Sequence, residues 1–237
     1  MKSFRSGRER IDRAVSEKHR HERLNSVIGM NSIDSITLEV ADIAAAERFY
    51  DAAFGLGDLL RFRASDAPTT GFRGYTLSLI VAQPSTVTAL IDSAVAAGAT
   101  TLKPVEKSLW GYGGSVQAPD GAIWKVATSA KKDTGPATRA VEKIVLLLGA
   151  EDVTASKRVY VDRGLTVGKS FGSYVDFAMP SSPVGLGLYK RRALAKDAGV
   201  APEGSGSHRI AINSGNESFT DPDGFVWEPA PVTAVQS

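Results

Sequence analysis

A stretch of eight residues occurs in two versions, Ala118-Pro119-Asp120-Gly121-Ala122-Ile123-Trp124-Lys125 and Asp221-Pro222-Asp223-Gly224-Phe225-Val226-Trp227-Glu228. In both versions Pro-Asp-Gly favours a tight turn, and the glycine tolerates a positive φ angle. The apolar residues that follow alternate as they do along a strand, whose successive side chains face opposite sides. Each version therefore predicts a turn that leads into a strand.

A second pair of similar segments precedes these turns. Residues 36–40 alternate like a strand and lead into residues 42–50, where Asp42 is a suitable N-cap and apolar residues line one helical face. Residues 144–148 lead in the same way into residues 152–160. From the start of the first strand to the tryptophan of the repeat there are 88 residues in one copy and 83 in the other. The chain is therefore predicted to be a tandem duplication.

The predicted domain boundaries follow from this duplication. They are a basic N-terminal extension at 1–29, a first module at 30–130, a polar linker at 131–139, a second module at 140–232 and a short tail at 233–237. The first module has an amphipathic helix at 86–97, for which the second module has no counterpart. The remaining predicted strands are 59–64, 75–82, 167–171, 174–179, 184–190 and 208–213.

The composition of the 237 residues excludes several classes of protein. The chain has no cysteine, so disulfides and thiolate zinc sites are ruled out. No apolar run approaches the ~20 residues of a membrane span, and the N-terminus has no signal peptide, so we expect a cytoplasmic protein without membrane partners. The extension holds eight Lys or Arg against four Asp or Glu, whereas the rest of the chain is slightly acidic. A nucleic-acid partner is therefore not expected.

The order of these elements, present twice, resembles the glyoxalase / bleomycin-resistance / extradiol-dioxygenase family, also called the vicinal oxygen chelate family. The resemblance rests on a strand, a helix that ends near Phe49-Tyr50 and Gly55-Leu56, a run of strands and the closing turn with its tryptophan. It spans about residues 30–230. It implies an α+β fold of tandem βαβββ-type modules, whose curled mixed sheets surround a shared cavity. It also implies that a two-module chain forms a homodimer.

The resemblance further indicates where the metal-using members of this family hold their metal. The first-strand position falls on Ser35 in the first module and on Lys143 in the second, and the closing-strand position falls on Lys125 and Glu228. His208 lies near the middle-strand position. Two lysines would oppose a divalent cation, since like charges ~4 Å apart repel by roughly 4 kcal/mol at an effective dielectric of 20. No cofactor is therefore expected.

Two functions stay open. The first is a protein that binds a small aromatic or anionic organic molecule between its modules without a metal; Lys125, Lys143 and His208 would then hold an anion. The second is a divalent-metal-dependent lyase or dioxygenase that uses His208 and Glu228, with Glu39 as a substitute ligand. These last three are also the candidate catalytic residues. A lysine paired with Glu228 would instead take over the structural role of the metal.

Strand alternation assigns the candidate ligand-binding residues. Ser35, Thr37 and Glu39 are predicted to share the cavity face of the first strand, while Ile36, Leu38 and Val40 pack against helices. Aromatic side chains suit planar ligands, although an aromatic residue on a strand is more often part of the core. The loop at 109–114 contributes Trp110 and Tyr112. The complete set is Ser35, Thr37, Glu39, Trp110, Tyr112, Lys125, Lys143, Tyr174, Tyr189 and His208, with Phe62 and Phe177 as further aromatic candidates and Trp124 and Trp227 assigned to the core.

Overall fold

The computed structural model describes residues 32–108, 111–215 and 218–230. The predicted N-terminal extension, the predicted tail and Trp110 lie outside the described residues. The first half of the chain contains β1 (Ser35–Val40), α2 (Ile43–Ala53), η1 (Gly57–Leu59), β2 (Leu60–Ala64), β3 (Thr69–Gly71), β4 (Tyr75–Ile80), α3 (Pro84–Ala96), β5 (Thr100–Ser108), β6 (Gly111–Gln117) and β7 (Ile123–Thr128). The second half contains β8 (Lys143–Ala150), α4 (Val153–Asp162), β9 (Thr166–Phe171), β10 (Tyr174–Ala178), β11 (Val184–Lys190), α5 (Arg191–Ala198), β12 (Gly204–Gly206), β13 (Ile210–Asn213), β14 (Phe219–Thr220) and β15 (Val226–Glu228).

An eight-stranded sheet has the strand order β5-β6-β7-β4-β8-β11-β10-β9. Its two central strands, β4 and β8, are antiparallel, and each has a parallel neighbour, β7 or β11. The order is therefore symmetric about the centre. One side is the βαβββ unit β4-α3-β5-β6-β7, and the other is the unit β8-α4-β9-β10-β11. Each half of the chain supplies one complete unit.

A five-stranded sheet has the order β14-β15-β13-β1-β2 and follows the same plan in reduced form. Here β1 and β13 are the antiparallel central strands, and their parallel neighbours are β2 and β15. The unit from the first half keeps its helix α2, whereas β13 of the second half is followed directly by β14 and β15 among the described residues. Both sheets thus combine strands from the two halves, so neither half forms a sheet of its own.

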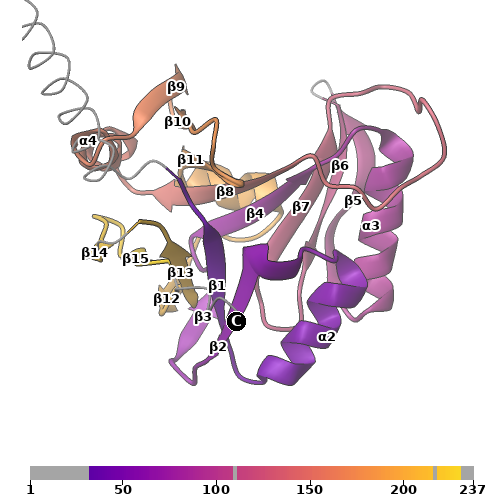
Figure 1. Ribbon diagram of the computed structural model, residues 1–237, viewed down its shortest axis with the longest axis horizontal. Helices are drawn as coiled ribbons and strands as arrows, with labels where there is room; N and C mark the ends of the chain where they lie inside the picture. Colours follow the sequence, from indigo (N-terminus) through magenta and orange to yellow (C-terminus); the bar gives the residue numbers. More distant parts are fainter. Residues whose placement is uncertain (1–31, 109–110, 216–217, 231–237) are drawn as a thin grey trace, which may run out of the picture.

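One large core lies between the sheets and the helices that cover them. Asp42 caps α2 by accepting a hydrogen bond from the Ala45 amide at 2.9 Å, as predicted from the sequence. The alternating residues Ile36, Leu38 and Val40 of β1 are all buried in this core. Trp124 and Trp227 are completely buried there too, which confirms their assignment to the core. Helices α2 and α3 pack against each other beside the strands of the first half (Figure 1).

Helix α5 covers the opposite face of the eight-stranded sheet. It contacts β4, β8 and β11 and is the pale orange helix behind β4 and β8 in Figure 1. Its buried residues Leu194, Ala195 and Ala198 form a second, smaller core with Phe72 and Ile123. The helix ends at Gly199, whose φ of 89° closes it in the left-handed conformation that glycine adopts readily. Part of the face that the resemblance assigns to a cavity is therefore filled by this helix.

The α+β fold with curled sheets predicted from the sequence is confirmed. The helix predicted at 86–97 is α3, and the predicted strands all appear with ends shifted by a few residues. No helix in the described ranges is long and apolar enough to cross a membrane.

Candidate functional site

Two of the family's metal positions, Ser35 and Glu228, fall on one face of the five-stranded sheet, and this face is polar, whereas the other two, Lys125 and Lys143, lie on the eight-stranded sheet. Ser35, Thr37 and Glu39 share this face of the five-stranded sheet, as alternation along β1 predicts. Strand pairing adds Asn213 beside Ser35, and Glu228 beside Asn213. We call these five residues, together with Arg61 and Arg63 of β2, the polar face.

Asn213 of β13 links its strand to β1, which belongs to the other half of the chain. Its Oδ1 atom accepts hydrogen bonds from the Thr37 hydroxyl at 2.8 Å and from the Ser35 hydroxyl at 3.1 Å. All three residues are buried. A carboxamide is a neutral group with one acceptor oxygen, and here that oxygen already serves two donors. These three side chains form a satisfied polar cluster at the bottom of the polar face.

Arg63 joins two carboxylates above this cluster. Its guanidinium donates to both oxygens of Glu228, at 2.9 and 3.1 Å, and to Glu39 Oε1 at 2.7 Å. The side chain of Arg63 is 44% exposed, against 19% for Glu39 and 28% for Glu228. The hydrogen bonds with Glu228 and then with Glu39 raise the pKa of the Arg63 guanidinium above its usual value. The three residues form one charged network, in which the Arg63 guanidinium keeps its positive charge at any physiological pH.

The contact between Arg63 and Glu228 requires a curled sheet. Strands β2 and β15 are separated by β1 and β13, so in a flat sheet they would lie about 14 Å apart at ~4.8 Å per strand. The two residues are also offset along the strands, because Arg63 is level with Glu39 whereas Glu228 is level with Asn213 and Ser35. Since their side chains nevertheless touch, the polar face is the concave face of the sheet.

The polar face does not fit the metal that the resemblance implies. A metal bound to both carboxylates would need the position of the Arg63 Nη2 atom, which lies 2.7 Å from Glu39 Oε1 and 3.1 Å from Glu228 Oε1. The first-strand position on this face carries Ser35, whose hydroxyl donates to the Asn213 carboxamide oxygen. Within the described residues, no group of three or more His, Asp or Glu is placed to hold a metal ion.

His208 has a different role from the one predicted. Its Nδ1 atom lies 2.5 Å from the Arg73 carbonyl oxygen, and its Nε2 atom lies 3.0 Å from the Asp223 carbonyl oxygen. Its ring stacks on Phe225 with the ring centroids 4.1 Å apart. Both nitrogens are therefore engaged with backbone carbonyls, and the side chain ties the second turn to the segment before β4. It does not join Glu39 and Glu228 in a common cluster.

Lys125 and Lys143 share the face of the eight-stranded sheet on which α5 lies. Lys125 is level with Ser78 of β4, and Lys143 is level with Ile80 of the same strand. The Lys125 ammonium forms an ion pair with Asp197 of α5. The structure therefore places the two lysines on one face but does not bring His208 to them, because that residue is held by the turn beside the other sheet.

The aromatic candidates divide between the two faces of the eight-stranded sheet. Tyr174 and Tyr189 lie on the face of α5 and contact each other edge to face, with the ring centroids 5.8 Å apart. Tyr112 belongs to strand β6, not to a loop, and its hydroxyl lies 3.3 Å from the Thr88 hydroxyl of α3. The pleat therefore turns Tyr112 toward the helical layer. Phe62 and Phe177 also belong to this layer, where Phe62 stacks on Tyr50 and Phe177 contacts Tyr160.

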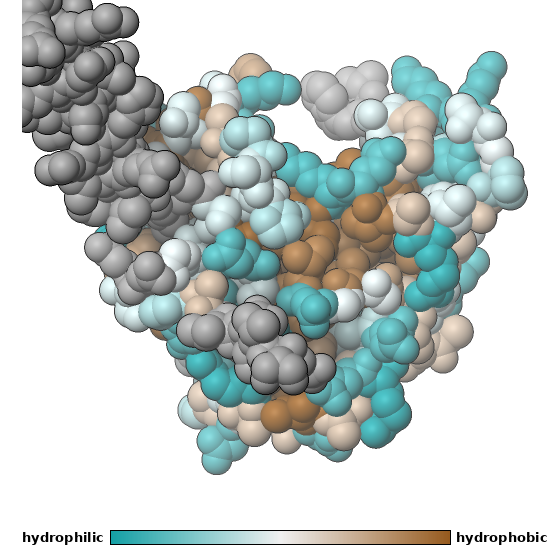
Figure 2. All heavy atoms as spheres, viewed as in Figure 1, coloured by the Kyte–Doolittle hydropathy of each residue, from teal (hydrophilic) through white to brown (hydrophobic). Residues whose placement is uncertain are grey.

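A hollow of about 360 Å³ lies where the two halves meet, and it contains Lys143. Its apolar lining comes from the end of α2, η1, the entry into β8 and the residue before β11, namely Phe54, Leu56, Leu59, Val141, Ile144 and Pro183. Arg139, Glu142 and Lys143 also line it. Figure 2 shows hydrophobic residues gathered in a hollow near the middle of the molecule, between α2 and the segment that leads into β8.

Among the described residues, neither Arg139 nor Lys143 has a carboxylate partner. Arg139 is fixed by hydrogen bonds from its guanidinium to the Ala52 carbonyl oxygen at 2.8 Å and to the Ser93 hydroxyl at 3.0 Å. The Lys143 side chain runs over Gly185 on the α5 face, opposite to Ile144 and the apolar floor, so the hollow combines that floor with the guanidinium of Arg139 and the carboxylate of Glu142.

Each copy of the repeated stretch anchors a helix through a tyrosine. In the second copy Tyr160 of α4 donates to Asp221 at 2.6 Å and accepts from the Trp227 indole at 3.3 Å. The Asp221 carboxylate also accepts from the Phe225 amide at 2.8 Å. Burial raises the pKa of Asp221 and of Tyr160. The repeated stretch therefore connects the turn, its strand and the helix through one network of hydrogen bonds.

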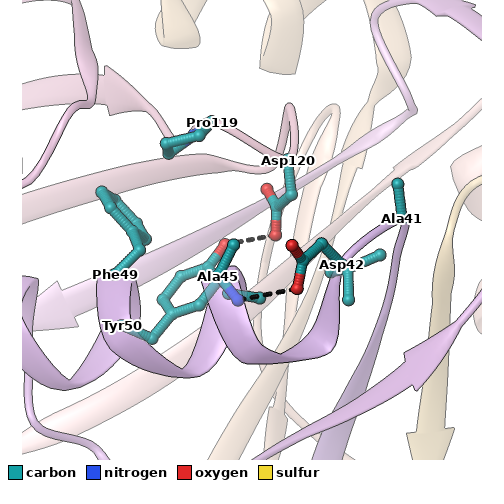
Figure 3. Close-up of a pocket in the computed structure, with 9 residues that line it drawn as sticks. Ala41, Asp42, Ala45, Phe49, Tyr50, Pro119 and Asp120 are labelled. Atoms are coloured by element: carbon teal, nitrogen blue, oxygen red, sulfur yellow. Dashed lines mark hydrogen bonds between the residues drawn. The ribbon is translucent and has the colours of Figure 1, made fainter.

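The first copy lacks part of this hydrogen-bond network. Ala118 stands where the second copy has Asp221, so Tyr50 donates instead to Asp120 at 2.8 Å and accepts from Trp124 at 3.2 Å (Figure 3). Ala46 stands where the second copy has a serine. The small side chains leave a hollow of about 180 Å³, whose lining includes Ala46 and Asp120. This volume is below the usual range of small-ligand sites, ~300–1,000 Å³.

The sequence-based prediction missed two residues of the polar face, Arg63 and Asn213. The alternation of polar and apolar residues indicates the orientation of both side chains. Arg61 and Arg63 alternate with Leu60 and Phe62 along β2, which indicates a strand with one polar face. Asn213 ends a strand whose residues 210 and 212 are apolar, so it points to the opposite side from them.

Comparison with solved structures supports this architecture. Glyoxalase I from Zea mays aligns with a TM-score of 0.56 at 14% identity, over 83% of this chain and 90% of that chain. A point mutant of the same maize enzyme gives 0.56 at 14% identity, over 83% and 92%. A candidate dioxygenase from Bacillus subtilis subsp. subtilis str. 168 gives 0.51 at 13% identity, over 83% and 72%. No protein-family model and no curated protein matches the sequence.

These likenesses define the class of fold. The chain has the vicinal oxygen chelate fold, which is the fold of glyoxalase I and of the glyoxalase/bleomycin-resistance/dioxygenase proteins. At 13–14% identity the likeness extends to the fold and not to the activity of those proteins.

Proposed function

We propose that this protein binds a small organic anion without the help of a metal, in the hollow where its two halves meet. The observation that carries the proposal is the pairing of an apolar floor with the Arg139 guanidinium, which forms no salt bridge among the described residues. An apolar cavity with a few charged groups that fix the orientation of the ligand is the usual design of a small-molecule site. The volume of about 360 Å³ suits a ligand of one or two rings or a short acyl chain.

The charges favour an acid over its neutral analogue. Arg139 is held in place before any ligand binds, since its guanidinium hydrogen-bonds Ala52 and Ser93. A pre-positioned guanidinium loses little freedom when it pairs with a carboxylate. The Glu142 carboxylate disfavours ligands with two negative charges. The expected ligand is therefore a monocarboxylate with an apolar body.

A binding screen with matched acids and amides tests this proposal. Benzoate, indole-3-carboxylate and octanoate are compared with their amides by ligand-observed NMR and calorimetry, in buffer that contains EDTA. We expect at least one acid to bind about tenfold or more tightly than its amide, because a charge-assisted hydrogen bond contributes ~1.5–3 kcal/mol. Arg139→Gln should remove most of that preference, whereas Lys131→Met in the linker should leave it unchanged.

Several results would reject the proposal. Equal binding of acids and amides, or an acid preference that survives in Arg139→Gln, would show that Arg139 does not select the ligand. Failure of every compound to bind would reject the hollow as a site for this class. Binding that disappears in EDTA and returns with added metal would support a metal-dependent function instead.

A further inference from the structure

Arg63 stands where a cation would be needed to hold the concave polar face together. Its Nη2 atom contacts Glu39 and Glu228 at once, and its Nη1 atom completes a two-pronged contact with Glu228. The two carboxylates come from opposite halves of the chain, since Glu39 is in β1 and Glu228 is in β15. Without a positive charge between them, they would repel each other across the concave face.

The surroundings of Arg63 are those of a hard cation. The side-chain atoms that it contacts in this network are carboxylate oxygens of Glu39 and Glu228. Oxygen ligands of this kind suit Mg²⁺, Ca²⁺ and Mn²⁺, and Mg²⁺ is commonly held by only one or two carboxylates plus water. Two carboxylates with one guanidinium keep a net charge of −1, which a divalent ion would cancel more completely.

We infer that the Arg63 guanidinium is the built-in cation of this face, and that it occupies a divalent-cation site which the chain would otherwise present. The guanidinium ties β2 of the first half to β15 of the second half, the strands that flank the central pair β1 and β13. A mobile metal ion is thereby replaced by a side chain that cannot dissociate. The inference concerns a different site and a different chemistry from the proposed ligand hollow, so its test does not depend on the outcome of the ligand screen.

The test compares the wild type with Arg63→Met and Arg63→Lys. Mn²⁺ binding is measured by calorimetry and by the loss of the free-ion electron paramagnetic resonance signal, and thermal unfolding is followed with EDTA and with Mn²⁺. In EDTA, Arg63→Met should unfold about 2–4 °C below the wild type, because the two carboxylates are then left without a cation between them. Added Mn²⁺ should reverse that shift and bind at least tenfold more tightly than to the wild type.

The controls separate a real site from nonspecific binding. Arg63→Lys keeps a cation between the carboxylates, so it should bind Mn²⁺ no better than the wild type. The double variant Arg63→Met/Glu228→Gln should lose the gained affinity. If Arg63→Met does not fold in EDTA, refolding with Mn²⁺ should rescue it, and lack of rescue would refute the inference. Wild-type protein that binds Mn²⁺ as tightly as Arg63→Met would refute it too.

Discussion

Replacing Asp221 by alanine should destabilise the fold strongly, although this residue lies in a turn. Its carboxylate accepts hydrogen bonds from the Tyr160 hydroxyl at 2.6 Å and from the Phe225 and Asp223 amides at 2.8 and 2.9 Å. The first two donors are buried. Alanine would leave both without an acceptor, and each such loss costs ~1–3 kcal/mol.

The net effect is smaller than the full sum of these costs. Burial disfavours the ionised form of Asp221 and raises its pKa, so removing the carboxylate relieves some unfavourable desolvation. We therefore expect the free energy of unfolding to fall by about 3 kcal/mol, which corresponds to a decrease of about 6–12 °C in Tm. Urea unfolding at pH 7, followed by tryptophan fluorescence and circular dichroism, measures this loss. Asp92→Ala on the exposed side of α3 is the matched control and should change the stability by less than ~0.5 kcal/mol.

The pH dependence supplies a second and independent readout. The folded-state pKa of Asp221 is above its ordinary value of 3.8, so the folded state holds its proton more tightly than the unfolded state. The titration of Asp221 therefore stabilises the fold at low pH, and this contribution is lost as the pH rises through the folded-state pKa. The stability advantage of the wild type over Asp221→Ala should be larger near pH 3.8 than at pH 7. Equal stabilities of Asp221→Ala and Asp92→Ala would refute the reasoning.

Two further substitutions test other parts of the fold. Leu194→Ala in α5 should lower the free energy of unfolding by about 2–5 kcal/mol, because Leu194 is completely buried between the helix and the eight-stranded sheet. Urea unfolding measures this loss. A loss below ~1 kcal/mol would mean that α5 contributes little to the stability. His208→Phe keeps an aromatic ring for stacking on Phe225 but removes the ring nitrogens that contact the Arg73 and Asp223 carbonyl oxygens, so a loss of about 1–3 kcal/mol is expected. An unchanged Tm would show that these contacts add nothing to the stability.

The sequence was sufficient to predict the fold because its signals are local. The repeated turn, the capping Asp42 and the alternation of Ile36, Leu38 and Val40 each involve neighbouring residues, and together they specify elements in a definite order. The division of β1 into an apolar and a polar face followed from the same alternation.

The partners across the sheets could not be predicted in this way. A lysine opposite Glu228 was one of the hypotheses, and the cation found there is Arg63, which reaches it over two intervening strands of a curled sheet. Curvature of that degree results from the packing of the whole chain and has no local sequence signal. For the same reason the sequence did not indicate that α5 fills part of the face of the eight-stranded sheet or that His208 binds the segment before β4. Whether the predicted ligand-binding residues bind a ligand stays a prediction.

The way the two halves share their sheets has a consequence for synthesis on the ribosome. Every strand of the eight-stranded sheet has been made once Lys190 has left the exit tunnel, so that sheet can close while translation continues. Strand β1, the first to emerge, must wait for β13, whose residues follow it by more than 170 positions in the pairing of Ser35 with Asn213. Until then one edge of β1 is an unpaired template for other chains. Release of a nascent chain before residue 210 would therefore yield a species that is prone to aggregate, and the speed of the last stage of translation matters more for this protein than for one whose halves fold separately.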